Sequence, residues 1–468
     1  MLPTTKRALF VALSALLAPF ALAQAPITIG NLVAVRIGDA TSSGTSAATP
    51  MFLDEYTPTG TFVQTIALPT TPSGSNFACT NTGSGTSAGQ LNVATNGLYL
   101  TVAGYDAPVG TAAVATTAVA SARRVIARVD LNGTVDTTTG LTDAYDLGNI
   151  RGVVSDDGAR FWTTGSVQIT GGTRFVANVG DSTSVQVNTG SPDNCRQITI
   201  FHGDLYITSA SGTTHGVARV GTGLPTAPAS APISLLPGFP TVSGPSNYDM
   251  FWANPTTVYV ADDQTGGAGG IQKWVLNAGT WTKVYTLAPG ISTGCTGVTG
   301  FVQNGVATLW ATARTGTTTQ IVTVVDNGAG STVSSIVPAP AAGHFRGIRR
   351  IGTPMNTQTF PVACGPANIK VTGNAEIGTD VFTSVTTSFF GVSLIGYDLV
   401  PAFVPFCNCT IGHPWSIVMG GPDHTLTISP SWGAMIGMDI YVQAADIFSP
   451  FGCTDSFQLT DTAKFTIQ

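Results

Sequence analysis

Leu98-Tyr99-Leu100-Thr101 is the first of five short segments that place one aromatic residue among apolar and β-branched neighbours. The other four centre on Trp162, Tyr206, Tyr259 and Trp310, so that successive aromatics lie 63, 44, 53 and 51 residues apart. Such compositions are typical of β-strands, and recurrence at roughly 50 residues indicates an array of similar units. The aromatic strand therefore predicts a repeat architecture.

Each aromatic segment lies in a unit of four predicted strands separated by turns that contain Gly, Asn or Asp. Asn132-Gly133 and Asn304-Gly305 are dipeptides favoured in β-hairpins. Four antiparallel strands in roughly 50 residues are the signature of a β-propeller blade. We predict an all-β chain with a six-bladed propeller over residues 27–352. The repeated aromatic is expected to pack between blades rather than stack on a sugar, because five equivalent positions favour a scaffold role.

The first unit has one strand too few, with predicted strands only at 31–37, 50–56 and 61–68. The missing strand is predicted at 345–351, where the sequence resembles the strand openings at Arg151 and Arg196. Pairing the two ends of the repeat array would close the ring and remove its exposed edges. A seventh blade is the alternative, because residues 107–122 could hold another strand. That stretch is uncharged and rich in Ala, Thr and Val, and we interpret it as a loop.

The last part of the chain has a different texture. Residues 353–366 contain Pro and Thr and are expected to form a linker. Residues 367–468 lack the aromatic repeat and are expected to form a small β-sandwich clipped by disulfides. Its predicted strands are 368–372, 379–386, 392–400, 424–429, 438–444 and 464–467.

The composition limits the classes of partner. Charged residues make up 9% of the chain, against roughly 25% in ordinary soluble proteins. A formal net charge of -6 argues against nucleic acid, which is bound by a basic face.

The first 23 residues read as an export signal. Lys6 and Arg7 precede an apolar run of 15 residues at 8–22, and the small residues Ala21 and Ala23 suit cleavage after Ala23. A membrane anchor is the alternative, but the run is shorter than the roughly 20 residues needed to span a bilayer. No later segment is long and apolar enough to span. The mature chain is expected to be secreted, at the cell surface or in the periplasm, and to meet an extracellular glycan or protein ligand.

Seven cysteines fit an oxidising compartment. Three are dispersed, and four crowd into the last quarter of the chain: Cys364, Cys407, Cys409 and Cys453. Disulfides are favoured over a metal site there, because Cys407 and Cys409 are closer in sequence than zinc ligands usually are. The preferred pairing is Cys409 with Cys453 and Cys364 with Cys407, although four cysteines allow three connectivities. The odd total leaves at least one thiol unpaired or paired across chains.

No catalytic constellation emerges from the sequence. The five histidines are scattered, and there is no Gly-x-Ser-x-Gly elbow, phosphate loop or dinucleotide fingerprint. Adjacent acids such as Asp54-Glu55 point to opposite faces of a strand, so they do not by themselves form the facing carboxylates of a glycosidase. We predict no catalytic residues.

One group of residues indicates ligand binding. Arg151, Arg196 and Arg346 open the inner strands of three predicted blades, and Asp249 lies near the same point of a fourth. Such strand starts converge on one mouth of the central channel, where arginines could hold a carboxylate or sulfated group. The alternative is that these arginines bridge neighbouring blades or meet backbone carbonyls.

The loop that begins with Asp262 and Asp263 and continues into Gly266-Gly267 is a weaker candidate, for calcium. No other cofactor is predicted.

The segments 52–58 (Phe-Leu-Asp-Glu-Tyr-Thr-Pro), 103–108 (Ala-Gly-Tyr-Asp-Ala-Pro) and 149–151 (Asn-Ile-Arg) resemble a family of secreted bacterial propeller proteins with no assigned biochemical role. The resemblance covers residues 31 to about 352 and implies architecture and export, with no catalytic residues to carry over. In blade count and spacing the chain is also similar to NHL-repeat and lactonase-like propellers. Those enzymes use acidic metal ligands at the channel mouth, where this chain has mostly Arg, Gln, Tyr and Thr.

Two functional hypotheses follow. The first is a secreted, non-enzymatic binding or surface-interaction protein. The alternative is an extracellular propeller hydrolase or lyase that acts on a polysaccharide or a lactone.

Overall fold

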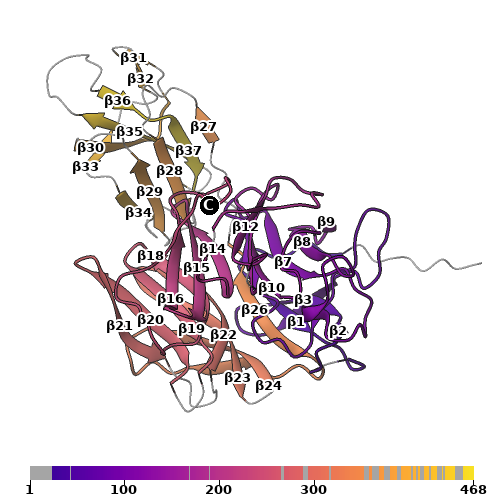
Figure 1. Ribbon diagram of the computed structural model, residues 1–468. Coiled ribbons are helices and arrows are strands. Elements are labelled where there is room, and N and C mark those ends of the chain that lie inside the picture. The colour runs from indigo at the N-terminus through magenta and orange to yellow at the C-terminus, as the bar shows by residue number, and fades with distance from the viewer. Residues whose placement is uncertain are drawn as a thin grey trace, which may run out of the picture.

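The computed structural model describes residues 24–352 except 43, 168, 189, 265–267, 288–293 and 316–317, and, beyond them, residues 358–360, 368–373, 380–386, 392–401, 404–406, 409–411, 416–420, 423–428, 435, 438–447 and 457–467. The signal segment expected at 1–23 lies outside the described residues. Almost all regular structure in the described residues is strand (Figure 1). η1 (Val114–Thr116) is a short 3₁₀ turn.

Six four-stranded antiparallel sheets follow one another along the chain, and each is one blade. Blade 1 contains β26 (His344–Arg350), β1 (Leu32–Ile37), β3 (Met51–Tyr56) and β4 (Phe62–Ala67). Blade 2 contains β6 (Leu91–Val93), β7 (Tyr99–Tyr105), β8 (Arg124–Asp130) and β9 (Val135–Leu141). Blade 3 contains β10 (Ile150–Val154), β11 (Phe161–Gly165), β12 (Thr173–Val176) and β13 (Val185–Gln186). Blade 4 contains β14 (Cys195–Phe201), β15 (Asp204–Ser211), β16 (Thr214–Val220) and β17 (Ile233–Leu235). Blade 5 contains β18 (Asn247–Asn254), β19 (Thr257–Asp262), β20 (Gly270–Asn277) and β21 (Thr280–Leu287). Blade 6 contains β22 (Gly294–Gln303), β23 (Val306–Thr315), β24 (Thr318–Val325) and β25 (Ser334–Val337).

The ring closes as the sequence predicts. β26 pairs antiparallel with β1, with Leu32 opposite Arg350 and Ile37 opposite His344. The first-listed strands of the six blades neighbour one another in the cyclic order β26, β6, β10, β14, β18, β22 and back to β26. A strand from the end of the repeat array therefore completes the blade at its start, and the six-bladed propeller is confirmed. Residues 107–122, the alternative location of a seventh blade, hold η1 and no strand.

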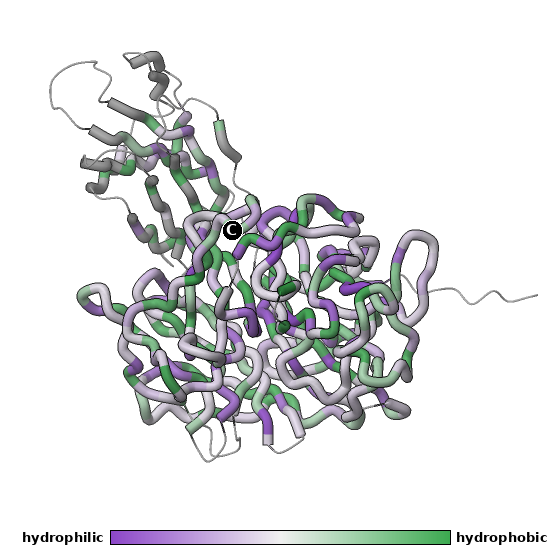
Figure 2. Tube along the Cα trace, viewed as in Figure 1, coloured by the Kyte–Doolittle hydropathy of each residue, from purple (hydrophilic) through white to green (hydrophobic). Residues whose placement is uncertain are grey.

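The hydrophobic core is divided among the blades. Six clusters of buried residues each join two neighbouring blades, one cluster at every junction of the ring. Figure 2 shows hydrophobic residues spread through all blades rather than gathered in one centre. A single blade cannot bury both of its faces, so each depends on its neighbours.

The repeated aromatics lie at these junctions. The Trp162 indole donates to Pro225 O at 2.7 Å, and the Trp310 indole donates to Pro58 O at 3.0 Å, each reaching the following blade. The Tyr206 and Trp252 rings lie 4.7 Å apart across the next junction. The Tyr259 hydroxyl donates to Asp326 after β24. The aromatic repeat is therefore scaffold.

Tyr99 occupies the fifth junction. Its ring lies so close to Gly158, which has a φ of +84°, that a Cβ there would fall 2.1 Å from the ring. Gly158 is thus required both by its turn and by the close approach of the neighbouring blade.

The final part of the chain forms a β-sandwich. One sheet contains β27 (Gln358–Phe360), β37 (Thr462–Thr466), β35 (Asp439–Ile447), β30 (Val392–Asp398), β33 (Ile417–Gly420) and β36 (Phe457–Leu459). A second contains β28 (Asn368–Gly373), β29 (Asp380–Thr386) and β34 (Asp423–Thr427). Two short pairs complete the strand inventory: β31 (Val404–Phe406) with β32 (Cys409–Ile411), and β2 (Ala48–Thr49) with β5 (Asn81–Thr82).

The two larger sheets share one buried cluster, which includes Val381, Ile395, Val442 and Phe465. Figure 1 shows them, in orange to yellow, gathered apart from the six blades. β27 lies within the segment expected to be a linker and pairs with β37.

Candidate functional site at the entry mouth

Five of the six innermost strands share a local irregularity close to their first residues. The pairing of β10, β14, β18 and β22 with the next strand of the blade shifts register there, and so does the pairing of β26 with β1. A β-bulge of this kind re-aims side chains. The residues inside the bulges are Arg151; Arg196 and Gln197; Tyr248 and Asp249; Thr296; and Arg346 and Gly347. We call the end of the ring where the inner strands begin the entry mouth.

A fully paired polar network crosses the axis just beyond the entry mouth. The Asp249 carboxylate is completely buried and accepts two hydrogen bonds from Arg349, at 2.7 and 2.9 Å. It also accepts from Gln197 Nε2 at 3.1 Å and from the backbone N–H of Val298 at 3.0 Å. Asp249 therefore joins the inner strands of blades 1, 4, 5 and 6.

Asn92 extends this network to the remaining blades. Its side chain accepts from Arg349 at 3.0 Å and donates to Val153 O at 2.7 Å and to Ile198 O at 2.8 Å. Side chains and backbone groups from the inner strands of all six blades thus meet on the axis. We call the group formed by Asn92, Gln197, Asp249 and Arg349 the axial network; it forms the floor of the entry mouth.

Arg151 and Arg196 each reach the following blade. Arg151 Nη1 donates to Asn194 Oδ1 at 2.5 Å and to Cys195 O at 3.2 Å. Arg196 Nη1 donates to Ser246 Oγ at 3.0 Å and to Asn247 O at 2.9 Å.

These contacts match the bridging interpretation, and they use only part of each guanidinium. Among the described residues neither Arg151 nor Arg196 has a carboxylate partner. Burial and, after it, the positive charge of Arg196 lower the pKa of Arg151 to about 10. Arg151 therefore remains cationic at neutral pH.

Arg346 is buried against backbone carbonyls. Its Nε donates to Gly85 O at 3.2 Å, its Nη2 to Gly83 O at 3.0 Å and its Nη1 to Phe345 O at 3.1 Å. Burial and, after it, the charge of Arg314 lower the pKa of Arg346 to about 10. Arg346 has no carboxylate partner in the described part of the chain. Its guanidinium and that of Arg314 lie near one another where burial weakens solvent screening.

A small cavity opens beside these two arginines. Its volume is about 170 Å³, and we call it the entry pocket. It is lined by Gly44, Gly83, Ser84, Thr86, Arg314, His344 and Arg346. The lining therefore combines cationic groups, hydroxyls and glycine backbone, and it contains no acidic residue. Such a lining suits a carboxylate, sulfate or phosphate group.

Tyr248 connects the entry pocket to the other arginines. Its hydroxyl lies 2.7 Å from the hydroxyl of Thr86, and the Arg196 guanidinium lies 4.1 Å from its ring centroid. Burial raises the pKa of Tyr248, although the neighbouring Arg196 opposes the shift. Because Thr86 lines the pocket, the pocket and Arg196 belong to one continuous mouth.

Several buried polar atoms at this end lack a protein partner. In the described part of the chain they include Gln90 Oε1, Arg151 Nε and both amide atoms of Asn247. Gln90 and Asn247 are fully buried at the beginning of their inner strands or just before it. An unpaired buried polar atom costs about 1–3 kcal/mol, so this end of the ring retains unused hydrogen-bonding capacity.

The predicted acidic residues lie deeper or are already engaged. Asp249 belongs to the axial network rather than to the mouth itself. The buried Asp262 carboxylate accepts from the backbone of Ser246 and Gln264 and from Gln272 Nε2. Burial, opposed by those backbone hydrogen bonds, raises the pKa of Asp262. Asp263 adjoins Tyr248. Among the described residues, no group of three or more His, Cys, Asp or Glu could hold a metal ion.

Three of the cysteines are free thiols. Cys79, Cys195 and Cys295 are buried and free, and burial raises the pKa of each. Cys364, Cys407 and Cys453 lie outside the described residues, and Cys409 lies in β32. The preferred disulfide pairing stays a prediction.

Sequence reasoning missed Arg314, His344 and Thr86 as parts of the mouth. His344 is the first residue of the closing strand β26, and Arg314 lies four residues after Trp310 on β23. Both positions belong to the same end of a blade, and that shared position was the available signal.

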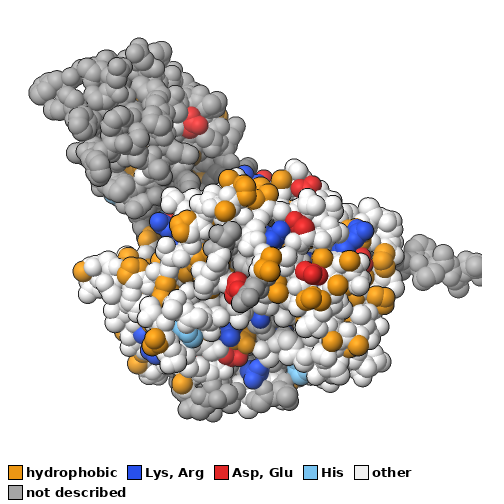
Figure 3. Space-filling view, viewed as in Figure 1, with side chains coloured by type: hydrophobic (Ala, Val, Ile, Leu, Met, Phe, Trp, Pro, Cys, Tyr) orange, Lys and Arg blue, Asp and Glu red, His pale blue; other side chains and the backbone are white. Residues whose placement is uncertain are grey.

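The surface of the molecule carries few charges. Figure 3 shows scattered charged side chains among apolar and uncharged ones on the viewed face. Within the described ranges, no helix has the length and apolarity to cross a membrane.

No protein-family profile and no curated protein sequence matches the chain. Solved structures with a similar fold include the WD40 domain of coronin from Toxoplasma gondii, with 10% identity, a TM-score of 0.34 and coverage of 95% of this chain and 89% of that chain. An exo-β-1,3-galactanase from Phanerochaete chrysosporium has 11% identity and a TM-score of 0.32, with coverage of 84% of this chain and 99% of that chain. AztD from Citrobacter koseri has 8% identity and a TM-score of 0.27, with coverage of 94% of this chain and 99% of that chain. These low scores carry no statement about function, and the propeller assignment rests on the strand pairing.

Proposed function

We propose that this protein is an exported binding protein whose propeller holds an anionic group of an extracellular glycan in the entry mouth. The observation that carries the proposal is the entry pocket, where Arg314, His344 and Arg346 line a cavity without an acidic residue. The group recognised is a carboxylate or a sulfate, because guanidinium groups bind both through paired N–H donors.

Two further observations support this function. Arg151 and Arg196 add positive charge to the same mouth without a carboxylate partner among the described residues. The axial network forms the floor of the mouth, and its polar groups are already paired with one another. A ligand would therefore contact the residues of the mouth rather than those of the axial network.

The test is direct binding of defined oligosaccharides to the mature chain. Oligogalacturonate and a chondroitin sulfate oligosaccharide are compared with maltohexaose as the neutral control, by calorimetry at low and high salt. We expect the acidic oligosaccharides alone to bind, with affinity that falls as salt rises. Arg314→Gln should weaken binding by about tenfold or more, since a hydrogen bond to a charged group contributes about 1.5–3 kcal/mol.

Arg219→Gln provides the matched control. Arg219 lies on β16 and its side chain is 43% exposed, paired with Asp204 at 3.7 Å. Its substitution removes one positive charge away from the mouth, so binding should stay unchanged. Equal weakening by both variants, or no binding to either acidic oligosaccharide, would refute the proposal. Shortening of the oligosaccharide in the same samples would favour the hydrolase or lyase alternative.

Export is part of the proposal and has its own measurement. N-terminal sequencing of the mature protein is expected to begin at Gln24, directly after the predicted cleavage site. A mature chain that retains Lys6 and Arg7 would contradict cleavage.

A further inference from the structure

A second cavity lies in the β-sandwich, between its two larger sheets. Its volume is about 330 Å³, and we call it the sandwich cavity. It is lined by Tyr397, Asp398, Leu399, Val400, Ser416, Leu426, Met435 and Ile440. Tyr397 and Ile440 belong to strands of one sheet, and Leu426 lies on β34 of the other. The cavity therefore continues the inter-sheet core toward the surface.

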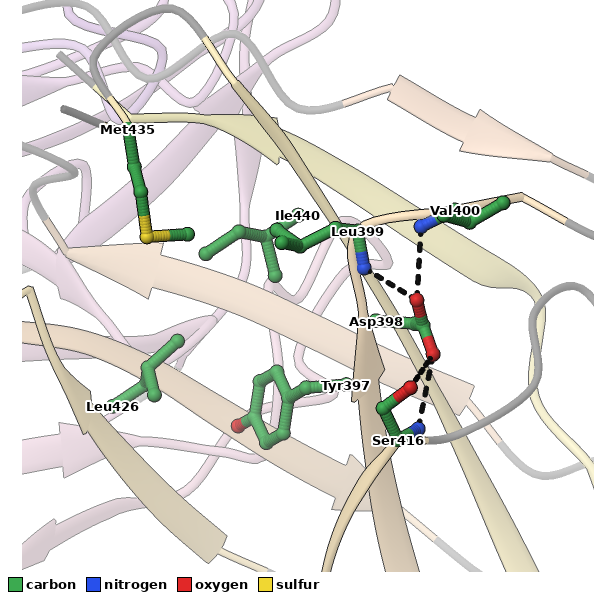
Figure 4. Close-up of a pocket in the computed structure, with 8 residues that line it drawn as sticks. All are labelled: Tyr397, Asp398, Leu399, Val400, Ser416, Leu426, Met435 and Ile440. Carbon is green, nitrogen blue, oxygen red and sulfur yellow. Dashed lines mark hydrogen bonds between the residues drawn. The ribbon is translucent and has the colours of Figure 1, made fainter.

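The walls are mostly apolar. Figure 4 shows Met435, Ile440, Leu426 and the Tyr397 ring arranged around the space, with Asp398 and Ser416 grouped at one side. Leu399 and Val400 are 42% and 58% exposed, so two large apolar side chains border the opening. Exposed apolar residues next to an apolar cavity are a common feature of ligand sites.

The polar groups of the wall are already satisfied within the protein. The Asp398 carboxylate accepts from the backbone N–H of Leu399 at 2.7 Å and of Val400 at 2.9 Å. It also accepts from the Ser416 N–H at 3.0 Å and from the Ser416 hydroxyl. The Tyr397 hydroxyl lies 2.6 Å from the hydroxyl of Thr383. No carboxylate oxygen is left without a donor, so the cavity has no charged group dedicated to a polar ligand.

Asp398 also sets the charge that a ligand would meet. Partial burial would raise the pKa of Asp398, but hydrogen bonds from the Ser416 side chain and from backbone N–H groups keep it below its ordinary value. The carboxylate is therefore ionised at neutral pH. It would repel an anionic head group held next to it.

We propose that the sandwich cavity binds one small, uncharged, apolar molecule, such as a medium-chain alcohol. Its volume lies at the lower end of the range for small-molecule sites, about 300–1,000 Å³. Apolar cavities of this kind are dry and take up apolar ligands. A second copy of the chain is the competing occupant. Its position between two sheets, with walls on several sides, favours a small molecule over a flat protein surface.

The experiment uses the mature chain and N-phenyl-1-naphthylamine, a neutral apolar fluorophore. We expect saturable binding with one site, displacement by 1-decanol, and at least about tenfold weaker displacement by decanoate, since tenfold corresponds to about 1.4 kcal/mol. Failure of the wild-type protein to bind the probe, or equal displacement by decanol and decanoate, would overturn the proposal. Acidic oligosaccharides should not displace the probe, so this result is independent of the entry mouth.

Two substitutions locate the site. Val400→Asp places a second charge at the opening and should weaken probe binding by about tenfold or more, through the cost of burying a charge. Val418→Asp is the matched control, because Val418 is 48% exposed on β33 and does not line the cavity. Leu426→Trp fills the cavity and should abolish binding, provided that its unfolding transition matches the wild type. Probe binding that survives both Val400→Asp and Leu426→Trp would place the probe elsewhere. A dimer that Val400→Asp dissociates would assign the face to a second copy.

Discussion

Arg349 is the residue on which the centre of the propeller depends. It lies three positions after Arg346 in the same strand, and the two side chains have different environments. Arg346 meets loop carbonyls at the mouth, whereas Arg349 forms a two-point ion pair with the buried Asp249. The sequence assigned Asp249 to the mouth because it lies near the start of its strand, at a point equivalent to the three arginines. The bulges in β18 and β26 break the regular alternation of side chains, and a bulge leaves no reliable signature in composition or spacing.

Removing Arg349 should destabilise the fold. Arg349→Met leaves the Asp249 carboxylate buried without its cation, and breaking a buried pair in this way costs about 3–5 kcal/mol. The free energy of unfolding in urea measures the loss. Arg219→Met is the control: its pair with Asp204 is half exposed, so about 1 kcal/mol or less is expected. Equal losses of unfolding free energy in the two variants would mean that the buried Arg349–Asp249 pair stabilises the fold no more than a half-exposed pair does.

The blades show how far element-level reasoning extends. The closing strand was predicted at 345–351 and is observed as β26 at His344–Arg350, because an unpaired strand at the start of a repeat array requires a partner. Predictions in the last part of the chain were less complete: its longer strands were anticipated, but β27, β31, β32, β33 and β36 were missed. Those strands have three or four residues, which is too short for a periodic pattern to stand out.

Close packing of β26 against β6 provides an element-level prediction. A Cβ at Gly347 would lie 2.3 Å from the backbone nitrogen of Leu91, which cannot move without disturbing the ring. Gly347→Ala should therefore lower the free energy of unfolding by about 1–3 kcal/mol through overpacking.

Gly330→Ala is the control for this substitution, because a Cβ at Gly330 would meet nothing within 4 Å. Chemical denaturation of both variants checks the expectation. A Gly347→Ala protein as stable as the wild type would show that the contact between the first and last parts of the array is not tight.

At the scale of the whole molecule, tyrosine titration should limit stability at high pH. Eight of the ten tyrosines have a raised pKa. Burial is the main cause in each, and it brings the pKa of Tyr56, Tyr105, Tyr206 and Tyr397 to about 12 from the ordinary value of 10.0. Above pH 10 the unfolded chain loses tyrosine protons that the folded chain keeps. Stability is therefore fully present below that pH and is lost as pH rises above it.

Absorbance at the tyrosinate band, followed together with circular dichroism during alkaline titration, measures this effect. We expect most of the tyrosinate signal to appear in a cooperative step that coincides with unfolding. Gradual titration of most tyrosines in a chain that stays folded would contradict the assigned burial.

The amino-acid order alone determined the architecture of the propeller: an aromatic strand recurring at nearly constant spacing, hairpin turns between strands, and a spare strand at the end of the array. These signals are local, since each is carried by a few consecutive residues. The mouth was decided by the tertiary structure. Arg314, His344 and Thr86 come from three distant segments, and Arg349 meets Asp249 across 100 residues. Whether an arginine pairs with a buried acid, bonds to carbonyls or lines a cavity depends on which strand edge the folded ring places opposite it, and that is set by bulges and ring closure.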